Sequence, residues 1–449
     1  MRTVYFDYNA TTPLDPAVRD VMLPFLGDVW GNPSSVHHIG RRARALLDEA
    51  RDRVAGVWGS KPSEVIFTSG GTEASNLAIF GAARLLRDKG RHLVTSRIEH
   101  HAVLHCFEYL EKKEGFQVTW LPVNAEGVVE VESLARALRP DTVLVSVMAA
   151  NNETGAIQPM AELGQLCRDR GVLFHTDAVQ WFGKEPFENI HQFHADLVSC
   201  CAHKFHGPKG AGALFIRSPL QPDPILVGGG HENERRAGTE NLASIIGFAE
   251  ATERFVKTPV FTREQLGPLT DRLVLLAESL ASRGVVLRSP RDQRLAHIDS
   301  APGAARPTPS PPAGGGEGWG EEDRRIQASP LSPALSPALS PLVLRGEREK
   351  PGAASAWAHR RLANTVAFTV RGTDSMTLLA GLDLEGICAS SGSACSAGSL
   401  EPSHVMVALG AGKDEANGLV RFSLGRDSTA AELSHVECVL PEVIARAQQ

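Results

Sequence analysis

A lysine flanked by two histidines and a Gly-Pro turn stands directly after an apolar run. Lys204 lies in the motif SCCAHKFHGPKG, residues 199–210, just past the run DLVSC. Most lysines are solvated surface charges, and Lys209, between Pro and Gly, fits that description. A lysine at a strand end is partly buried, which lowers its pKa and lets the amine act as a nucleophile or a base. Lys204 is therefore the better candidate for a Schiff-base lysine.

A carboxylate stands at the end of a second apolar run. Asp177 belongs to HTDAVQ, residues 175–180, which follows the apolar residues VLF. Such a carboxylate commonly caps the helix that follows it. Beside a pyridine nitrogen, it would instead keep that nitrogen protonated and make the ring an electron sink. The matching Lys204 favours the second interpretation.

The motif SGGTE, residues 69–73, separates the run EVIFT from the helical pattern ASNLAIFGAARLL. Two glycines between a strand and a helix leave backbone amides and the positive helix end facing an anion, as in phosphate sites. Thr72 adds a hydroxyl group. Ordinary strand-to-helix turns also use Gly and Thr, so the motif alone leaves both interpretations open.

One cysteine lies in a segment with little to pack against. Cys395 belongs to SSGSACSAG, residues 390–398, where Ser, Gly and Ala indicate a mobile loop. An isolated cysteine is usually an unreactive residue of the hydrophobic core, because cysteine is among the most often buried residue types. Here the loop context predicts an exposed thiol, whereas Cys388, with apolar neighbours, is predicted to lie in the core.

Alternating strands and helices are expected to position these residues. Between residues 61 and 216, short apolar runs alternate with amphipathic stretches, and the runs are EVIFT, HLVTS, TVLVSVM, VLFHTD and GALFIR. This order predicts an α/β fold with a mainly parallel sheet flanked by helices. Ligands bind at the carboxyl ends of strands in such sheets, and the polar motifs fall there.

A second, smaller α/β unit is expected after a helix at about residues 240–256. We predict a large domain at 15–258 and a small domain formed by 1–14 and 259–449. Residues 301–355 hold ten of the 28 prolines, a Gly run and the near-repeat SPLSPALSPALSP. They are predicted to be a disordered insertion, with a proline-rich peptide ligand as the alternative.

Bulk composition excludes several classes of protein. The 449 residues are 42% hydrophobic and 22% charged, which is ordinary for a globular protein. The net charge of -6 gives no indication of nucleic acid or an anionic membrane as a partner. No apolar segment is long enough for a membrane span, so we expect a cytoplasmic protein. Seven cysteines without a CxxC pair indicate free thiols rather than a disulfide framework or a zinc knuckle.

With these motifs placed, the sequence resembles group I cysteine desulfurases of the NifS/IscS type, within the class V aminotransferase superfamily of fold-type I pyridoxal 5'-phosphate (PLP) enzymes. The resemblance covers nearly the whole chain outside the insertion. It rests on DYNATT (7–12), GNPSS (31–35), SGGTEASNLAI (69–79), EHHAVL (99–104), NNETG (151–155), HTDAVQ (175–180), HKFHGPKG (203–210), RRAGTEN (235–241), SSGSAC (390–395) and RFSLGR (421–426).

The resemblance implies a role for each matching residue. Lys204 would bind PLP covalently, Asp177 would pair with the pyridine nitrogen, and His100 would stack on the ring and move protons. Gln180 and Asn152 would lie near the O3′ edge of the ring. The remaining implied groups are Gly71, Thr72, Cys201 and His203 at the phosphate, Thr239 from a second subunit, and Asn9 and Arg421 at the substrate carboxylate.

The resemblance also implies the reaction and its partners. L-cysteine would become L-alanine while the Cys395 thiolate receives the sulfur as a persulfide for iron–sulfur cluster assembly or other thio-cofactors. The partners would be an acceptor or scaffold protein and a second subunit of a homodimer. No metal is required for catalysis, although Cys395 could contact a nascent iron–sulfur cluster, which is the sense in which we expect metal binding.

Some residues depart from the family pattern, and other functions remain open. Cys201 replaces a phosphate-contacting Ser and is a weaker donor. Ala363 stands where Pro is usual, and Tyr8 where Asn is common. A selenocysteine lyase or a class V aminotransferase is the alternative enzyme, although an aminotransferase has no use for Cys395. A non-catalytic sulfur carrier is the alternative outside the enzymes.

Overall fold

The computed structural model describes residues 3–291, 360–392 and 402–449, and all of them fall in one compact unit. The predicted insertion at 301–355 and Cys395 lie outside the described residues. Both expectations therefore stay predictions, as does the division of the chain into a large and a small domain.

Seven strands form the largest sheet. In sheet order they are β2 (Val65–Thr68), β8 (Gly212–Ile216), β7 (Leu197–Cys201), β6 (Leu173–Asp177), β5 (Thr142–Ser146), β3 (His92–Ser96) and β4 (Gln117–Leu121). Only β8 runs antiparallel to its neighbours. All five apolar runs noted above form strands, so the predicted mainly parallel α/β fold is confirmed.

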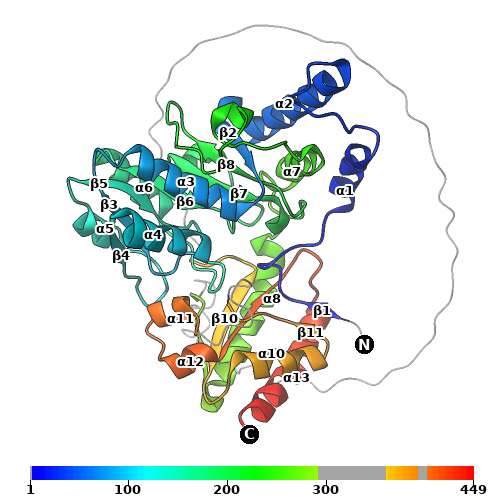
Figure 1. The fold of residues 1–449 in the computed structure, drawn as a ribbon. Helices are drawn as coiled ribbons and strands as arrows, with labels where there is room; N and C mark the ends of the chain where they lie inside the picture. Colours follow the sequence, from blue (N-terminus) through cyan, green and yellow to red (C-terminus); the bar gives the residue numbers. More distant parts are fainter. Residues whose placement is uncertain (1–2, 292–359, 393–401) are drawn as a thin grey trace, which may run out of the picture. The chain divides into compact units, whose positions relative to one another are not determined.

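Helices cover both faces of this sheet (Figure 1). They are α1 (Pro16–Met22), α2 (His38–Trp58), α3 (Gly71–Leu85), α4 (His101–Glu114), α5 (Val131–Ala137), α6 (Met160–Asp169) and α7 (Leu242–Phe255), with short 3-10 turns η1 (Leu23–Leu26), η2 (Pro62–Glu64), η3 (Ile190–Phe193), η4 (Ala202–Lys204) and η5 (His231–Glu234). Successive strand residues point to opposite faces. Ile66 accordingly joins the apolar cluster of α3 and α4, while the Phe67 ring lies 6.1 Å from that of Phe248 in α7.

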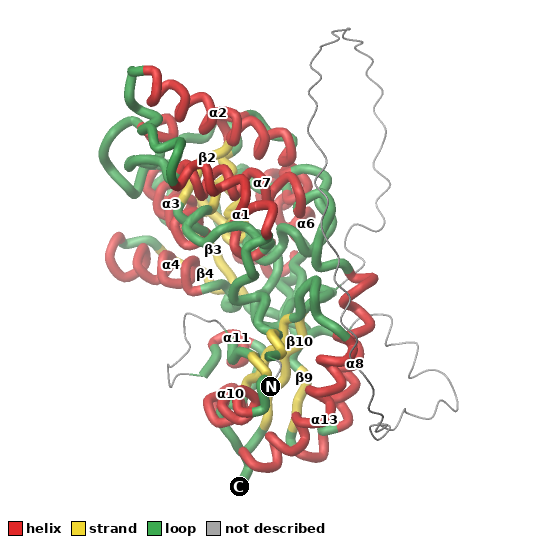
Figure 2. The backbone as a smooth tube through the Cα atoms, turned by 90° about the vertical axis from the view of Figure 1, so that its right-hand side faces the viewer, coloured by secondary structure: helices red, strands yellow, loops and turns green. Residues whose placement is uncertain are grey.

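The C-terminal part contains a second, antiparallel sheet in the order β12 (Leu419–Ser423), β10 (Thr365–Val370), β9 (Val285–Leu287). Around it lie α8 (Arg263–Ser279), η6 (Ala281–Arg283), α10 (Ser375–Leu384), α11 (His404–Ala408), α12 (Lys413–Asn417) and α13 (Ala430–Ala447). Figure 2 shows β9 and β10 beside α8 and α13. One apolar core joins the sheet to α8, α10 and α13, with the rings of Phe368 and Phe422 5.9 Å apart, whereas α11 and α12 contribute to a separate apolar cluster.

The N-terminal segment links the two sheets. Strand β1 (Val4–Tyr5) pairs in parallel with β11 (Ile387–Cys388), so the start of the described chain lies in the C-terminal part (Figure 1). Cys388, predicted to lie in the core, is half-buried there. The chain then reaches the large sheet, where the Thr12 amide donates to the His203 carbonyl oxygen at 2.9 Å. Asn9, between these two attachments, is thereby held near Lys204.

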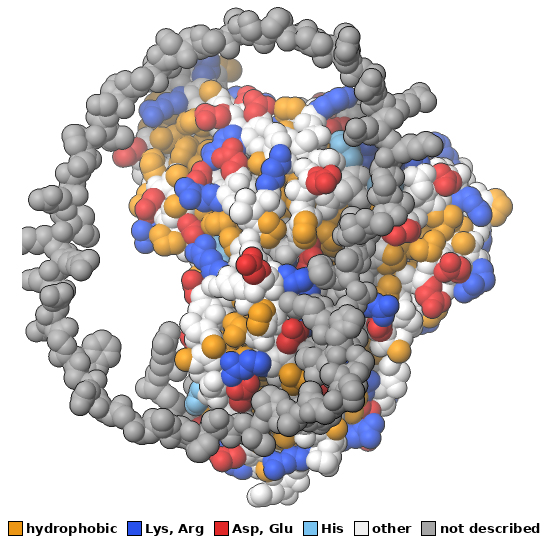
Figure 3. Space-filling view, turned by 180° about the vertical axis from the view of Figure 1, so that it is seen from behind, with side chains coloured by type: hydrophobic (Ala, Val, Ile, Leu, Met, Phe, Trp, Pro, Cys, Tyr) orange, Lys and Arg blue, Asp and Glu red, His pale blue; other side chains and the backbone are white. Residues whose placement is uncertain are grey.

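The surface mixes charges of both signs. Figure 3 shows Lys and Arg side chains interspersed with Asp and Glu on one face of the molecule. Over the described ranges, no helix has both the length and the apolar composition to cross a bilayer.

Candidate active site

Parallel strands place the predicted side chains along one edge of the large sheet. Their carboxyl ends share that edge because β2, β3, β5, β6 and β7 run in the same direction. The residues that end these strands, or follow them closely, are Gly71 and Thr72 after β2, His100 after β3, Asn152 after β5, Asp177 in β6, and Cys201, His203 and Lys204 at β7. Local sequence order and sheet direction together therefore gather most of the predicted site.

The Lys204 amine points back to the N-terminal segment. Its Nζ donates to the carbonyl oxygens of Asn9 at 2.6 Å and Ala10 at 2.8 Å. Burial lowers the pKa of Lys204, and the nearby Arg421 cation lowers it further, while Cys201 opposes the shift. An amine with a lowered pKa is more often neutral, and only the neutral amine is a nucleophile or a base.

Asp177 is a buried carboxyl group on the neighbouring strand. It ends β6, and its Oδ1 accepts a hydrogen bond from the Val179 amide at 3.0 Å. Burial raises the pKa of Asp177 to about 6, against the opposing effects of that hydrogen bond and of the Lys204 charge. A buried carboxylate is costly without a cationic partner. The site therefore offers this carboxylate to a positively charged or N–H-bearing group.

The start of α3 leaves its backbone accessible to a ligand. Gly70 has φ 156°, and no side chain caps the helix there. A Cβ atom on Gly71 would lie 2.7 Å from Cγ2 of Val179, so any other residue there would force the Val179 side chain to shift. Next to it, burial raises the pKa of Cys201 to about 11, although the Gly71 amide donates to its sulfur. The helix start thus brings backbone amides and a neutral thiol together at the strand ends.

Two histidines near Lys204 are held in the neutral form. Burial, and then the Lys204 charge, lower the pKa of His100 to about 4 and that of His203 to about 3. Nδ1 of His100 accepts from the Ala102 amide at 3.1 Å and caps α4. Nδ1 of His203 lies 3.2 Å from Oγ1 of Thr11. Since Nδ1 of His100 accepts a hydrogen bond, the neutral ring carries its hydrogen on Nε2, which is the nitrogen that can donate a proton to a group in the site.

Arg421 lies fully buried in β12. Its Nη2 bonds Oδ1 of Asp7 at 2.7 Å, and its Nη1 bonds the carbonyl oxygens of Asn152 at 3.0 Å and Gly392 at 2.6 Å. Its Nε is buried and has no hydrogen-bond partner within the described part of the chain. Buried donors normally have an acceptor. This N–H can therefore donate a hydrogen bond to an acceptor on a ligand that enters the site.

Asn9 and Gln180 belong to one amide network with a residue that the sequence analysis missed. Nδ2 of Asn9 donates to the Asn152 carbonyl oxygen at 3.0 Å and to Thr365 Oγ1 at 2.8 Å. Its Oδ1 accepts from the amine of Lys184 at 2.6 Å. A substrate carboxylate could bind the Asn9 amide only by displacing one of these partners.

Lys184 could have been noticed from its position. It stands four residues after Gln180 in WFGKEPF, where aromatic residues and a proline indicate a buried turn. The sequence analysis also did not single out two carboxyl side chains. Asp7 contacts Arg421, and Glu99 directly precedes His100. Both lie in motifs quoted above for the family resemblance.

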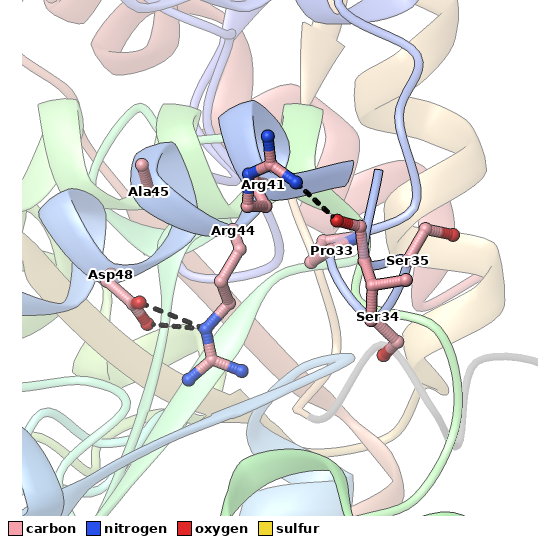
Figure 4. A pocket seen from close by; sticks show the side chains of 8 residues that line it. Pro33, Ser34, Ser35, Arg41, Arg44, Ala45 and Asp48 are labelled. Carbon is pink, nitrogen blue, oxygen red and sulfur yellow. Dashed lines mark hydrogen bonds and ion pairs between the residues drawn. The ribbon is translucent and has the colours of Figure 1, made fainter. Parts of the chain in front are cut away.

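Two predicted residues are not part of this cluster as described. Thr239 is exposed in the loop that precedes α7, and Cys395 lies outside the described residues. A surface hollow of about 440 Å³ between the GNPSS motif and α2 is lined by none of the predicted site residues (Figure 4). There Nε of Arg44 bonds both carboxylate oxygens of Asp48. We therefore do not assign the hollow to the chemistry at Lys204.

Comparisons with known proteins agree with this geometry. A family described as "Aminotransferase class-V" matches residues 4–266 and 349–436. "Cysteine desulfurase IscS" from Dictyoglomus turgidum is 40% identical over 99% of this chain and 95% of its own length. Among solved structures, a "NifS-like protein" is 30% identical with a TM-score of 0.77, covering 99% of this chain and all of that one. "SspA in complex with cysteine" is 28% identical with a TM-score of 0.70, covering 95% and all, respectively.

Proposed function

Because the chain belongs to the class-V aminotransferase family and, within it, to the cysteine desulfurases, we propose that it converts L-cysteine to L-alanine and passes the sulfur to an acceptor. The observation that carries the proposal is that the Lys204 amine and the Asp177 carboxyl group lie buried at the ends of adjacent strands, β7 and β6. Burial shifts the pKa of each toward its neutral form. This is the environment in which a lysine acts as nucleophile and base.

The residues present fit pyridoxal phosphate. The buried Asp177 carboxyl suits a protonated ring nitrogen, and the uncapped α3 start with Gly71 suits a phosphate. We therefore expect Lys204 to hold the cofactor covalently, with Thr72, Cys201 and His203 near its phosphate. When bound, the cofactor supplies an electron sink for the carbon atom that loses its proton.

The other side chains act on the substrate. Arg421 would bind its carboxylate, using the open Nε–H and exchanging a carbonyl partner such as Gly392 for it. The freed, neutral Lys204 amine would take the proton from the substrate Cα. Neutral His100 would donate the Nε2 proton beside it and later take it back, since its lowered pKa keeps the ring uncharged at pH 7 and its Nδ1 accepts from the Ala102 amide.

The sulfur step is assigned to Cys395. Its thiolate would form an S–S bond with the substrate sulfur while the substrate Cβ–S bond breaks, and protonation of the carbon chain would give alanine. The resulting persulfide would serve an iron–sulfur scaffold or another acceptor protein. Six further cysteines in the described residues are free thiols, which suits a reducing cytoplasm as the place of action.

A homodimer is the expected assembly. Large apolar side chains are exposed along residues 23–36, with Trp30 71% and Val36 87% exposed. Large exposed apolar side chains that cluster in this way favour a protein interface. Thr239, exposed on its own subunit, would then be available to the site of a second copy.

The decisive experiment follows sulfur and carbon together. Apo-protein loaded with pyridoxal phosphate should release alanine from L-cysteine and become heavier by one sulfur atom, as read by mass spectrometry. Cys395→Ser should still bind cysteine but gain no sulfur, whereas Cys388→Ser should behave as the parent. A parent that forms no alanine would overturn the proposed activity, and full turnover by Cys395→Ser would remove the persulfide step.

A further inference from the structure

Lys184 is a second buried lysine beside the Lys204 cluster, and the function proposed above does not use it. Its side chain is 3% exposed, in the turn after β6. Nζ donates to Oδ1 of Asn9 at 2.6 Å and to Oε1 of Gln180, and it lies 5.4 Å from the ring centre of Phe261. All three neighbours are neutral, so the lysine is not held there by an ion pair with them.

The amine dictates which way two amide groups face. A lysine amine carries at least two N–H donors in either protonation state, so it requires oxygen atoms at both contacts. The oxygen and nitrogen ends of an Asn or Gln side chain have the same shape, and hydrogen-bond partners decide their orientation. Lys184 therefore turns the oxygen end of Asn9 and of Gln180 toward itself.

The rest of the network agrees with that orientation. Nε2 of Gln180 donates to the backbone oxygen of Asn9 at 3.0 Å. Oδ1 of Asn9 also accepts from Nδ2 of Asn364 at 3.1 Å. Asn9 thus keeps a second donor if the lysine is removed. Among the described residues, the hydrogen-bond donor found for Oε1 of Gln180 is Lys184.

We propose that Lys184 is a positioning residue that holds the Gln180 amide so that an N–H, and not the carbonyl oxygen, is presented to a ligand beside Lys204 and Asp177. The bond to Asn9 uses one of the two hydrogens on Nε2, which leaves the other as the donor. The ligand chemistry that this donor suits is an anionic or phenolic oxygen on an aromatic ring. The inference rests on the proposed function, which places pyridoxal phosphate in this site.

Burial supports a role inside the site rather than on the surface. Burial lowers the pKa of Lys184 well below its ordinary value, and the Lys204 charge adds to the shift. A buried amine without a counterion among its contacts is costly, so its retention here calls for a specific task. Donation to two amide oxygens meets that need in both protonation states.

The test is a double-mutant cycle with apo-protein and pyridoxal phosphate. Lys184→Met should raise the dissociation constant for the cofactor roughly threefold to tenfold, the value of one hydrogen bond. It should also shift the pH midpoint of the visible absorbance band of bound cofactor. In the Gln180→Ala background, Lys184→Met should cause no further change, because it acts through that amide. Lys209→Met removes an exposed lysine of the same region and should match the parent.

A second variant covers the case in which Lys184→Met does not fold. Gln180→Glu keeps an oxygen acceptor for Lys184 but has no N–H, so it should weaken cofactor binding at least as much as Lys184→Met does. The inference would be overturned if Gln180→Glu bound the cofactor as tightly as the parent does. It would also be overturned if Lys184→Met raised the dissociation constant equally in the parental and the Gln180→Ala backgrounds. If the parent itself bound no pyridoxal phosphate, the proposed function would fail first, and the two failures are thereby distinguished.

Discussion

Nζ of Lys204 donates to the backbone oxygen of Asn9 at 2.6 Å, and this same oxygen accepts from Nε2 of Gln180 at 3.0 Å. One carbonyl group of the N-terminal segment therefore joins the two side chains that we expect at neighbouring positions of the cofactor ring, the aldehyde carbon and O3′. The amine has to leave this carbonyl when it becomes bonded to another group. A hydrogen bond of this kind costs only about 1 kcal/mol to exchange, so it holds the lysine in place without trapping it.

Replacing Lys204 should remove covalent cofactor binding. Lys204→Ala lacks the amine, so apo-protein mixed with pyridoxal phosphate should show the absorbance spectrum of the free aldehyde. Lys209→Ala should show the parental band, because Lys209 is exposed. The measurement is a visible spectrum after gel filtration. A parental spectrum from Lys204→Ala would mean that another lysine, with Lys184 the nearest candidate, holds the cofactor.

Two His100 variants should separate a structural from a chemical role. The ring caps α4 through Nδ1, and an asparagine can replace that cap, whereas alanine cannot. We expect both His100→Asn and His100→Ala to lower turnover about 100-fold, since neither has a ring nitrogen that can transfer a proton. Only the alanine variant should lose thermal stability, by ~1 kcal/mol. Near-parental turnover by His100→Asn would show that the cap alone matters.

Glu99 should make stability fall as the pH rises. Burial raises the pKa of Glu99 to about 8, although Ser96 and the Met148 amide donate to its Oε1. The folded protein then holds a proton that the unfolded chain releases, so stability present below the unfolded pKa is lost as pH rises through the folded pKa.

The side chain of Glu99→Gln does not titrate. The free energy of unfolding of this variant should therefore rise relative to that of the parent as the pH increases from about 4.3 to about 8. The gain should be ~1.4 kcal/mol per pH unit at most, and it should level off above pH 8. Urea unfolding of apo-protein at several pH values checks this. A difference that does not change with pH would show that Glu99 is ionised in the folded state.

Cys201→Ser should strengthen cofactor binding. The buried thiol stays protonated because burial raises its pKa to about 11, and a thiol is a weak donor. A serine hydroxyl in the same place donates a stronger bond to a phosphate, so the dissociation constant should fall roughly threefold to tenfold. Cofactor titration of apo-protein measures it. Cys200→Ser, next to it on the opposite strand face, should bring no such gain.

Local pattern was enough to predict most strands of the large sheet and the edge where chemistry would gather, but not strand β4 or the antiparallel direction of β8. Each strand is a short apolar run closed by polar residues, and the parallel direction follows from the helices between them. Asp177 and Lys204 were predictable as neighbours for this reason, because each stands at the end of its run. The pairing of β1 with β11, far apart in sequence, had no local signal beyond the family resemblance.

Only the tertiary structure decided the contacts that orient these side chains. Lys184 and Asn9 are 175 positions apart, and Asn9 and Thr365 are 356 apart. A buried amide or amine bonds whatever polar atom the packing leaves within about 3 Å, and that choice depends on three segments meeting. The sequence by itself therefore determined that Asp177 and Lys204 stand at the ends of strands, and packing decided which way the polar atoms around them face.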